Sequence, residues 1–237
     1  MSAAWAIYRK ELRVYIVSPL ATVFLGTFLF LAGLFFYLGV TMTGEASLRI
    51  MMGNLSVALM FLLPMLTMRH FAEEQRAGTL ELLMTAPIPL WALLLGKWAA
   101  TVTLCVALLI GTLLFPGLLA YYGDPDWGVV ATSYLGLFLC CNGFVAAGMF
   151  ASSMTEEPVT AGIVGVLMLL PFWIAGTAAE MVESDTARSV LRELSLTAHV
   201  DGFSRGVVDS ADVVWFVLFT FSFMFLTWRS VESRRWR

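Results

Sequence analysis

Charged residues are scarce in this sequence. Only 13% of the 237 residues are Asp, Glu, Lys or Arg, whereas 59% are hydrophobic. A typical soluble domain is about 25% charged and roughly 45–50% apolar, so this composition lies well outside the soluble range. It excludes a water-soluble enzyme, an intrinsically disordered chain and a nucleic-acid-binding protein with a basic surface. We therefore expect one membrane-embedded unit over residues 1–237 and no nucleic-acid partner.

Cysteine and histidine are rare as well. Three cysteines, Cys105, Cys140 and Cys141, lie in apolar stretches, so we expect buried thiols and no disulfide framework. The two histidines, His70 and His199, fall outside the long apolar stretches. Their position argues against haem ligation, a proton relay and an intramembrane Ser–His pair. We predict no catalytic residue and no metal site in this chain.

A phosphate-binding loop is also missing. The one Gly-Lys pair, Gly96-Lys97, is followed by Trp98 and lacks the upstream glycine of a GxxxxGK[ST] motif. The chain is therefore not expected to hydrolyse ATP alone. Any uphill transport would need energy from another polypeptide.

In place of charge, the sequence has long stretches without Asp, Glu, Lys or Arg. About 20 apolar residues, at ~1.5 Å per residue, cross the ~30 Å hydrocarbon core of a bilayer. Five stretches reach this length, and a shorter sixth is extended by Asp212 and Arg229 at headgroup level. The sequence therefore predicts an all-α polytopic membrane protein with six transmembrane helices, at Val14–Gly44, Ile50–Met68, Trp98–Gly123, Trp127–Thr155, Pro158–Ala179 and Val213–Trp228.

A further apolar stretch, Leu82–Gly96, is not counted as a span. It is short and carries Pro87 and Pro89 near its centre, which would break a spanning helix. The amino-terminal apolar stretch is far longer than the ~7–15-residue core of a cleaved signal peptide. We therefore expect it to be the first span.

The distribution of basic residues predicts the sidedness. With an even number of spans, both termini lie on one side of the membrane. That side carries ten of the 14 basic residues, namely Arg9, Lys10, Arg13, Arg69, Arg76, Lys97, Arg229, Arg234, Arg235 and Arg237. The opposite side carries the other four, Arg49, Arg188, Arg192 and Arg205. Because basic residues favour the cytoplasm, both termini are expected inside.

Residues 1–17 have the pattern of an amphipathic helix. Large apolar residues recur at steps of three and four with basic residues between them, namely Trp5, Tyr8, Leu12, Tyr15 and Ile16. This spacing predicts a helix that lies at the cytoplasmic interface. Ser18-Pro19 would then turn the chain into the first span.

The longest predicted inner segment covers residues 69–97. Phe71–Ala77 is expected to continue the second span as a helix, and Gly78 supplies a left-handed stop. Thr79 can cap a second short helix with Glu81 in its first turn. The apolar face of this helix would consist of Leu80, Leu83 and Met84, and Pro87 would end it. We call residues 69–87 the elbow. The elbow would carry Glu73, Glu74, Arg76 and Glu81 into the cytoplasm; a solvated turn back to the membrane remains the alternative.

These residues resemble a known family. The elbow is similar to the coupling-helix region of type 2 ATP-binding-cassette (ABC) exporter permeases, in the pattern Arg69, Phe71-Ala72-Glu73-Glu74, Arg76, Gly78-Thr79, Glu81-Leu82-Leu83, Thr85 and Pro87. The family's amino-terminal interfacial helix is resembled by Arg9-Lys10-Glu11-Leu12 with Ser18-Pro19. Its gliding-motility and multidrug branch is resembled by His199, Phe203, Arg205-Gly206, Val208-Asp209 and Asp212, with Glu232 and Arg234-Arg235-Trp236.

The resemblance implies a half-transporter of a bacterial inner membrane. Two six-span permeases, identical copies or paralogues, would pair, and separate ATPase subunits would dock on their elbows. ATP and Mg would be bound by the partner ATPase, and this chain would hold no cofactor and be no enzyme. The resemblance assigns the docking to Glu73, Glu74, Arg76, Gly78, Thr79 and Glu81.

The predicted extracytoplasmic segment, residues 180–212, is acidic and long enough for one or two short helices. The spacing from Val182 to Leu194 favours a helix resting on the membrane surface. His199 and Asp209 are too few ligands for a metal site, and a loop hydrogen bond is the expected role of His199. The family resemblance implies a gate in this segment, with its exit lined by Phe203 and Arg205.

Other functions stay open at this stage. A chain without charged intramembrane residues also suits a membrane anchor or scaffold subunit that transports nothing itself. Intramembrane enzymology is disfavoured because the two histidines lie outside the spans. No motif names a substrate, but an uncharged pathway favours lipids, amphipathic drugs or hydrophobic peptides over small ions.

Overall fold

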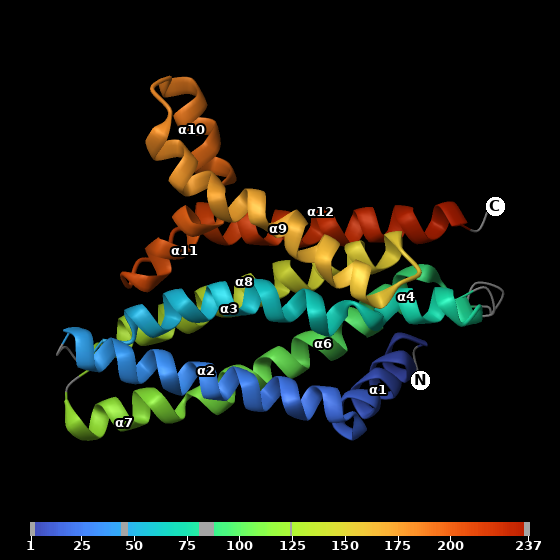
Figure 1. Ribbon diagram of the computed structural model, residues 1–237, viewed down its shortest axis with the longest axis horizontal. Helices are drawn as coiled ribbons and strands as arrows, with labels where there is room; N and C mark the ends of the chain where they lie inside the picture. Colours follow the sequence, from blue (N-terminus) through green and yellow to red (C-terminus); the bar gives the residue numbers. More distant parts are fainter. Residues whose placement is uncertain (1–2, 44–46, 81–87, 124, 235–237) are drawn as a thin grey trace.

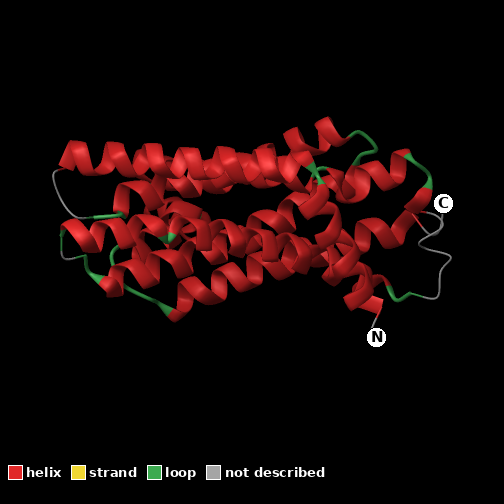
Figure 2. Ribbon diagram, turned by 90° about the horizontal axis from the view of Figure 1, so that it is seen from below, coloured by secondary structure: helices red, strands yellow, loops and turns green. Residues whose placement is uncertain are grey.

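The computed structural model describes residues 3–43, 47–80, 88–123 and 125–234. These residues form long helices that run side by side along one axis, and most connecting loops lie near the two ends of the bundle (Figures 1 and 2). In chain order the helices are α1 (Ala3–Val17), α2 (Pro19–Thr43), α3 (Arg49–Thr67), α4 (Arg69–Arg76), α6 (Leu90–Thr112), α7 (Leu114–Tyr122), α8 (Trp127–Met154), α9 (Pro158–Met181), α10 (Asp185–Leu194), α11 (Leu196–Ser204) and α12 (Ser210–Arg234).

The prediction of an all-α polytopic membrane protein is confirmed. Among the described residues, six helical segments are long and apolar enough to cross a membrane, namely Ala21–Met42, Arg49–Arg76, Leu90–Tyr122, Trp127–Met154, Pro158–Met181 and Ser210–Arg234. Each of them contains most of one predicted span.

Helix α8 forms the centre of the bundle. Every residue from Cys140 to Met149 is buried, because α3, α6, α9 and α12 pack around this helix. A helix that is buried on all sides has to be apolar on all sides. The outer helices expose large apolar side chains, for example Phe30, Ile163 and Phe221. An apolar exterior of this extent is suited to lipid rather than water.

The third span begins earlier than predicted, at Leu90 rather than Trp98. Pro89 has an extended backbone directly before α6, a position where its missing N–H leaves no helical bond unmade. The carboxyl-terminal half of the rejected stretch Leu82–Gly96 therefore forms the first turns of α6. Lys97, treated as the end of a loop, lies inside the helix. This boundary was wrong because a buried charge can be compensated by partners distant in the sequence.

The same span changes direction near its other end. α6 stops at Thr112 and α7 starts at Leu114. Pro116 is responsible, since it has no N–H to donate and its ring opposes the carbonyl of Thr112. The Leu113 N–H donates instead to the carbonyl of Ile110, at 3.1 Å, in a tighter turn.

The bundle has two distinct ends (Figure 1). At one end lie α1, α4, the start of α6 and the carboxyl-terminal turns of α12, and we call it the elbow end. At the other lie α7, α10 and α11, and we call it the far end. Because α1 and the last turns of α12 share an end, the arrangement agrees with six crossings.

The amino-terminal helix is present as predicted, but its buried face differs from the predicted apolar one. Ile7 and Tyr15 are buried, whereas Trp5 and Ile16 are largely exposed. α1 packs on α6 where Gly96 lacks a side chain; a Cβ there would lie only 2.9 Å from Ile7 Cβ. α1 therefore uses one face for α6 and leaves aromatic and aliphatic side chains on another.

The far-end segment contains the two short helices that its length allowed, α10 and α11. None of the described residues of α10 is buried, and the helix projects from the bundle (Figure 1). α11 instead packs on α8 and α9 and buries Leu196, His199 and Phe203.

Candidate coupling site

The elbow begins at a short break between α3 and α4. Met68 separates the two helices, so the first N–H groups of α4 need acceptors outside their own helix. Ser152 of α8 meets this need: its Oγ accepts from the N–H groups of Phe71 and Ala72, at 3.0 and 3.1 Å, and donates to the carbonyl of Met68 at 2.8 Å. One serine thus attaches the start of α4 to the central helix.

Helix α4 has one buried and one exposed side. His70, Phe71 and Ala72 are buried, whereas Glu73 and Arg76 are exposed. Further along the helix, the Gln75 side-chain amide donates to the carbonyl of Ser153 on α8, at 3.1 Å. α4 is therefore held along its length, while its predicted docking charges Glu73 and Arg76 face outward.

The predicted stop at Gly78 is confirmed. Gly78 has φ +67°, the left-handed conformation that favours glycine, and its N–H donates to the carbonyl of Gln75 at 3.0 Å. Thr79 and Leu80 are again helical. The Thr79 hydroxyl donates back to the carbonyl of Glu74, at 3.3 Å, and so closes the bend.

The rest of the predicted elbow and the carboxyl terminus lie outside the described residues. This holds for Glu81, Leu82, Leu83, Met84, Thr85, Pro87, Arg235, Trp236 and Arg237.

A buried lysine lies beneath the elbow. The Lys97 side chain is only 2% exposed, and its Nζ donates to Glu74 Oε1 at 2.8 Å, to Glu11 Oε1 at 3.1 Å and to the carbonyl of His70 at 2.9 Å. A charge in this position is tolerated only when counter-charges and acceptors surround it. Glu11 comes from α1, Glu74 from α4 and Lys97 from α6, so three helices meet at one ammonium group.

The charges of this cluster balance. Lys10 lies on the surface with its Nζ 3.7 Å from Glu11 Oε1 and 4.0 Å from Glu74 Oε1, so two cations face two carboxylates. Burial alone would raise the pKa of Glu11, but Lys97, His70 and Lys10 together outweigh it, and the pKa lies below its ordinary value. Oε2 of Glu74 is buried and has no hydrogen-bond partner among the described residues.

A second polar group lies beside the buried lysine. His70 Nε2 is 2.7 Å from Thr101 Oγ1, and the Tyr15 hydroxyl is 3.1 Å from the same oxygen. The Thr101 hydroxyl also lies 3.1 Å from the carbonyl of Lys97. Tyr15, His70 and Thr101 therefore link α1, α4 and α6 a second time.

The predicted gate residues occupy the far end. Phe203 is fully buried against α8, and its carbonyl accepts from the Thr132 hydroxyl at 2.8 Å. Arg205 is exposed and pairs with Asp201, which also pairs with Arg49 of α3 at 3.0 Å. Burial would raise the pKa of Asp201, but the two guanidinium groups outweigh it and lower it.

His199 is held by hydrogen bonds, as expected, but its contact with Asp212 joins two helices, α11 and α12, instead of lying within a loop. Its Nδ1 lies 2.6 Å from Asp212 Oδ1 and its Nε2 lies 3.2 Å from the carbonyl of Glu193. The ring stacks on Trp215 with 4.5 Å between centroids. In the part of the chain that the structure describes, no three His, Cys, Asp or Glu side chains gather as metal ligands would.

The comparison with known families decides the class of the protein. The model of the family described as "ABC-2 family transporter protein" matches residues 38–228. The chain belongs to this family. It is an integral membrane protein and the permease subunit of an ABC transporter, and the family's members are membrane subunits rather than ATPases. A search of the curated proteins found no match. The matched region includes the elbow and Lys97 of this permease, whereas α1 with Glu11 lies before it.

Sequence reasoning found the elbow but missed what anchors it. It assigned Glu74 to the docking surface, whereas this side chain is mostly buried beside Lys97. No local pattern marked the burial of Lys97, since a lysine at the end of a long apolar run ordinarily extends to the membrane interface. Ser152 gave no signal, since a serine in an apolar helix usually bonds to its own backbone.

Proposed function

We propose that this permease is half of an ATP-driven exporter of the gliding-motility and multidrug branch, driven by a separate ATPase subunit that docks on the elbow. The observation that carries the proposal is the two-sided character of α4. Its outer side presents charges, and its inner side is bonded to α1, α6 and α8 through Lys97 and Ser152.

Such a connection can transmit force. A displacement of α4 acts directly on α8 through the Ser152 hydrogen bonds and on α1 and α6 through the Lys97 ion pairs. Protein interiors are close-packed and resist compression, so the displacement passes to the helices around α8. An ATPase that pushes the elbow would thereby tilt the spans instead of bending a loose loop.

The predicted docking residues separate into two groups in this proposal. Glu73, Arg76, Gly78 and Thr79 are exposed and would contact the ATPase. Glu74 faces Lys97 and would anchor the elbow. Glu81 is proposed as a docking residue from the family resemblance alone.

The remaining parts of the proposal follow the sequence. The excess of basic residues at the elbow end favours the cytoplasm of a bacterial inner membrane for both termini. ATP and Mg would bind to the ATPase, and a second permease, identical or paralogous, would complete the pathway. Because Phe203 is buried against α8, a gate that uses it with Arg205 would require α11 to shift.

The docking is tested by reversing two exposed charges. The tagged permease is purified from its native membrane, and co-purifying ATPase subunits and ATP hydrolysis are measured for the wild type and for Glu73→Lys/Arg76→Glu. We expect the reversal to remove most of both signals. The matched control is Asp185→Lys/Arg188→Glu, which reverses an exposed ion pair on α10 and should change neither. Equal ATPase association in both double variants would refute docking on the elbow.

Export is tested separately. Inside-out vesicles that contain the complex should accumulate an amphipathic fluorescent dye when ATP is added, and the Glu73→Lys/Arg76→Glu vesicles should not. A membrane anchor or scaffold subunit, which the scarcity of charged intramembrane residues also allows, would show no ATP-dependent uptake of any dye, lipid or peptide probe. That result would favour the second function.

A further inference from the structure

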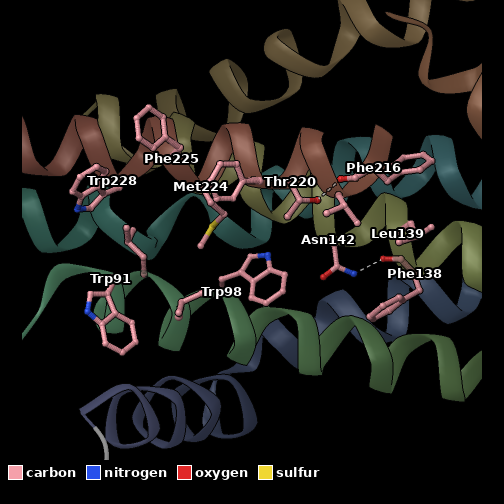
Figure 3. Close-up of a pocket in the computed structure, with 14 residues that line it drawn as sticks. Trp91, Trp98, Phe138, Leu139, Asn142, Phe216, Thr220, Met224, Phe225 and Trp228 are labelled. Atoms are coloured by element: carbon pink, nitrogen blue, oxygen red, sulfur yellow. Dashed lines mark hydrogen bonds between the residues drawn. The ribbon is translucent and has the colours of Figure 1, made fainter. Parts of the chain in front are cut away.

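An elongated apolar cavity lies between α6, α8 and α12 (Figure 3). Its volume is about 670 Å³, within the ~300–1,000 Å³ that small organic ligands usually occupy. The walls are mostly aromatic and aliphatic, among them Phe138, Phe216 and Met224. No residue of the elbow or of the predicted gate lines the cavity, so neither of those sites explains it.

One polar group in the cavity has no partner. The Trp98 indole nitrogen is buried and has no hydrogen-bond acceptor among the described residues. Figure 3 shows this indole on the wall of the cavity, about midway along it, with its nitrogen turned toward α12. The other polar side chains of the wall are already bonded to their own helices: Asn142 donates to the carbonyl of Phe138 at 2.6 Å, and Thr220 donates to that of Phe216 at 2.8 Å. A buried indole N–H normally has an acceptor, so this cavity suits a ligand that supplies one.

The level of Trp98 in the membrane indicates the ligand. α1 packs against α6 at Gly96, two positions before Trp98, and α1 has the character of an interfacial helix. The cavity reaches from Trp91 and Trp228 at the elbow end to Phe216 within the bundle (Figure 3). Tryptophan gathers at membrane–water interfaces. The Trp98 N–H therefore lies near the level of lipid ester carbonyls, and the cavity continues into the hydrocarbon region.

The cavity is open to the lipid side of the bundle. Its wall includes side chains that are largely exposed, namely Trp91 on α6 and Phe221 and Phe225 on α12. A helix of a second protein copy is about 10–12 Å wide with its side chains, so a volume of about 670 Å³ would hold less than two of its turns. An acyl chain is thin and apolar, and its ester group carries the missing acceptor.

We propose that this cavity binds one acyl chain of a phospholipid from the leaflet at the elbow end. The ester carbonyl accepts the hydrogen bond of Trp98 Nε1, and the chain runs past Phe138 toward Phe216. The bound lipid fills the space between α6 and α12. This inference depends on the protein being in a membrane and is independent of the proposed ATPase docking.

The proposal is tested by lipid binding to the purified permease. The protein is stripped of lipid in detergent, titrated with palmitoyl-oleoyl phosphatidylglycerol and analysed by native mass spectrometry. We expect one tightly held lipid per chain. Trp98→Phe keeps the ring but removes the donor, and it should weaken that binding about fivefold, as for one ordinary hydrogen bond. Thr220→Trp fills the cavity and should abolish it. Trp127→Phe, the same change on an exposed tryptophan of α8, should have no effect.

A second measurement locates the lipid. In vesicles that contain a phospholipid with a photoreactive diazirine in its acyl chain, labelling should concentrate on cavity residues such as Met224 and exceed that of an outer position such as Phe30. Unchanged binding in Trp98→Phe, or labelling spread evenly over all exposed faces, would overturn the site. So would efficient cross-linking of two copies through Phe221→Cys, because a second copy would then cover the cavity. If Thr220→Trp fails to fold, the conservative Trp98→Phe variant still decides the question.

Discussion

The two ends of the bundle are held together by different kinds of contact. At the elbow end, a buried ammonium joins carboxylates from two other helices, and a buried serine joins α4 to α8. At the far end, the arginine–carboxylate pairs lie on the surface: Arg49, Asp201 and Arg205 are each more than 40% exposed. A mostly buried hydrogen bond joins His199 to Asp212, and α11 is otherwise held mainly by Phe203 and other apolar side chains.

This difference bears on how each end can move. A buried ion pair loses much energy when one partner shifts, because the charge left behind has no solvent. A surface pair loses little, because water replaces the partner. We therefore expect the elbow end to move as one body, as force transmission requires. The far end can rearrange at lower energetic cost, as a gate requires. Four sets of variants test this difference between the two ends.

The largest effect is expected from removing the buried cation. Lys97→Met leaves Glu11 and Glu74 without their shared partner and should lower the free energy of unfolding by about 3–5 kcal/mol. Arg205→Met removes a cation of the exposed far-end pair and should cost at most about 1 kcal/mol. Both values can be measured by denaturant titration in a mild detergent. Similar losses in the free energy of unfolding for Lys97→Met and Arg205→Met would show that the buried charges at the elbow end stabilise the fold no more than the exposed charges at the far end.

The second prediction concerns serines on the central helix. Ser152→Ala leaves the N–H groups of Phe71 and Ala72 unsatisfied and should cost about 2 kcal/mol. Ser153→Ala is the local control, because this equally buried hydroxyl bonds only within its own helix, to the carbonyl of Phe150. Ser133→Ala is the far-end counterpart.

The expected losses for the two comparison serines are small. The carbonyl of Phe203 keeps its bond from Thr132 when Ser133 is removed, so Ser133→Ala should cost less than about 0.5 kcal/mol. Thermal unfolding of the three variants ranks them directly. If Ser152→Ala unfolded at a temperature no lower than Ser153→Ala, the Ser152 side chain would not anchor the break between α3 and α4.

The third prediction compares the two glycines with positive φ among the described residues. Gly78 has φ +67° at the elbow, and Gly206 has φ +88° at the far end. Alanine in this conformation costs roughly 1–2 kcal/mol. Gly206→Ala should be the costlier change, because its Cβ would lie 3.0 Å from Val129 Cγ2, whereas no described atom lies within 4 Å of a Cβ on Gly78.

The two glycine variants should differ more in ATP hydrolysis by the complex than in the free energy of unfolding. Gly78→Ala should reduce ATP hydrolysis by the complex, because it alters the direction in which the chain leaves α4. Gly206→Ala should leave ATP hydrolysis unchanged at temperatures where the protein is folded. If ATP hydrolysis fell in both variants in proportion to their loss of stability, the elbow end would have no greater influence on hydrolysis than the far end.

The extent to which the sequence predicted these features follows from the range of the interactions. The spans, the left-handed Gly78 and the amphipathic α1 depend on local composition and spacing, and all three were predicted. The start of α6 was misplaced because Lys97 is compensated by Glu11 and Glu74, and no local pattern marks that pairing. The burial of Phe203 and the role of Ser152 depend on which helices meet, so they required the structure.

The smallest predicted effect is a dependence on pH. Glu11 and Asp201 both have lowered pKa values in the folded protein. A carboxylate of this kind stabilises the fold above its ordinary pKa, which is 4.5 for Glu11 and 3.8 for Asp201. The stabilisation is lost as the pH falls below that value, because the unfolded chain takes up the proton first. The difference in the free energy of unfolding between the wild type and Glu11→Gln should therefore decrease as the pH is lowered from about 6 to about 3. The same should hold for Asp201→Asn.

Added salt should distinguish the two carboxylates, since the Asp201 side chain is 42% exposed and that of Glu11 only 12%. Raising the ionic strength from about 0.1 M to about 1 M shortens the screening length from about 10 Å to about 3 Å. The stability difference for Asp201→Asn should then nearly vanish, while the difference for Glu11→Gln should persist, because solvent ions do not reach its contact with Lys97. If salt reduced the stability difference equally for Glu11→Gln and Asp201→Asn, the Glu11–Lys97 pair would behave as a surface pair. That result would contradict the rigidity that we infer for the elbow end from its buried charges.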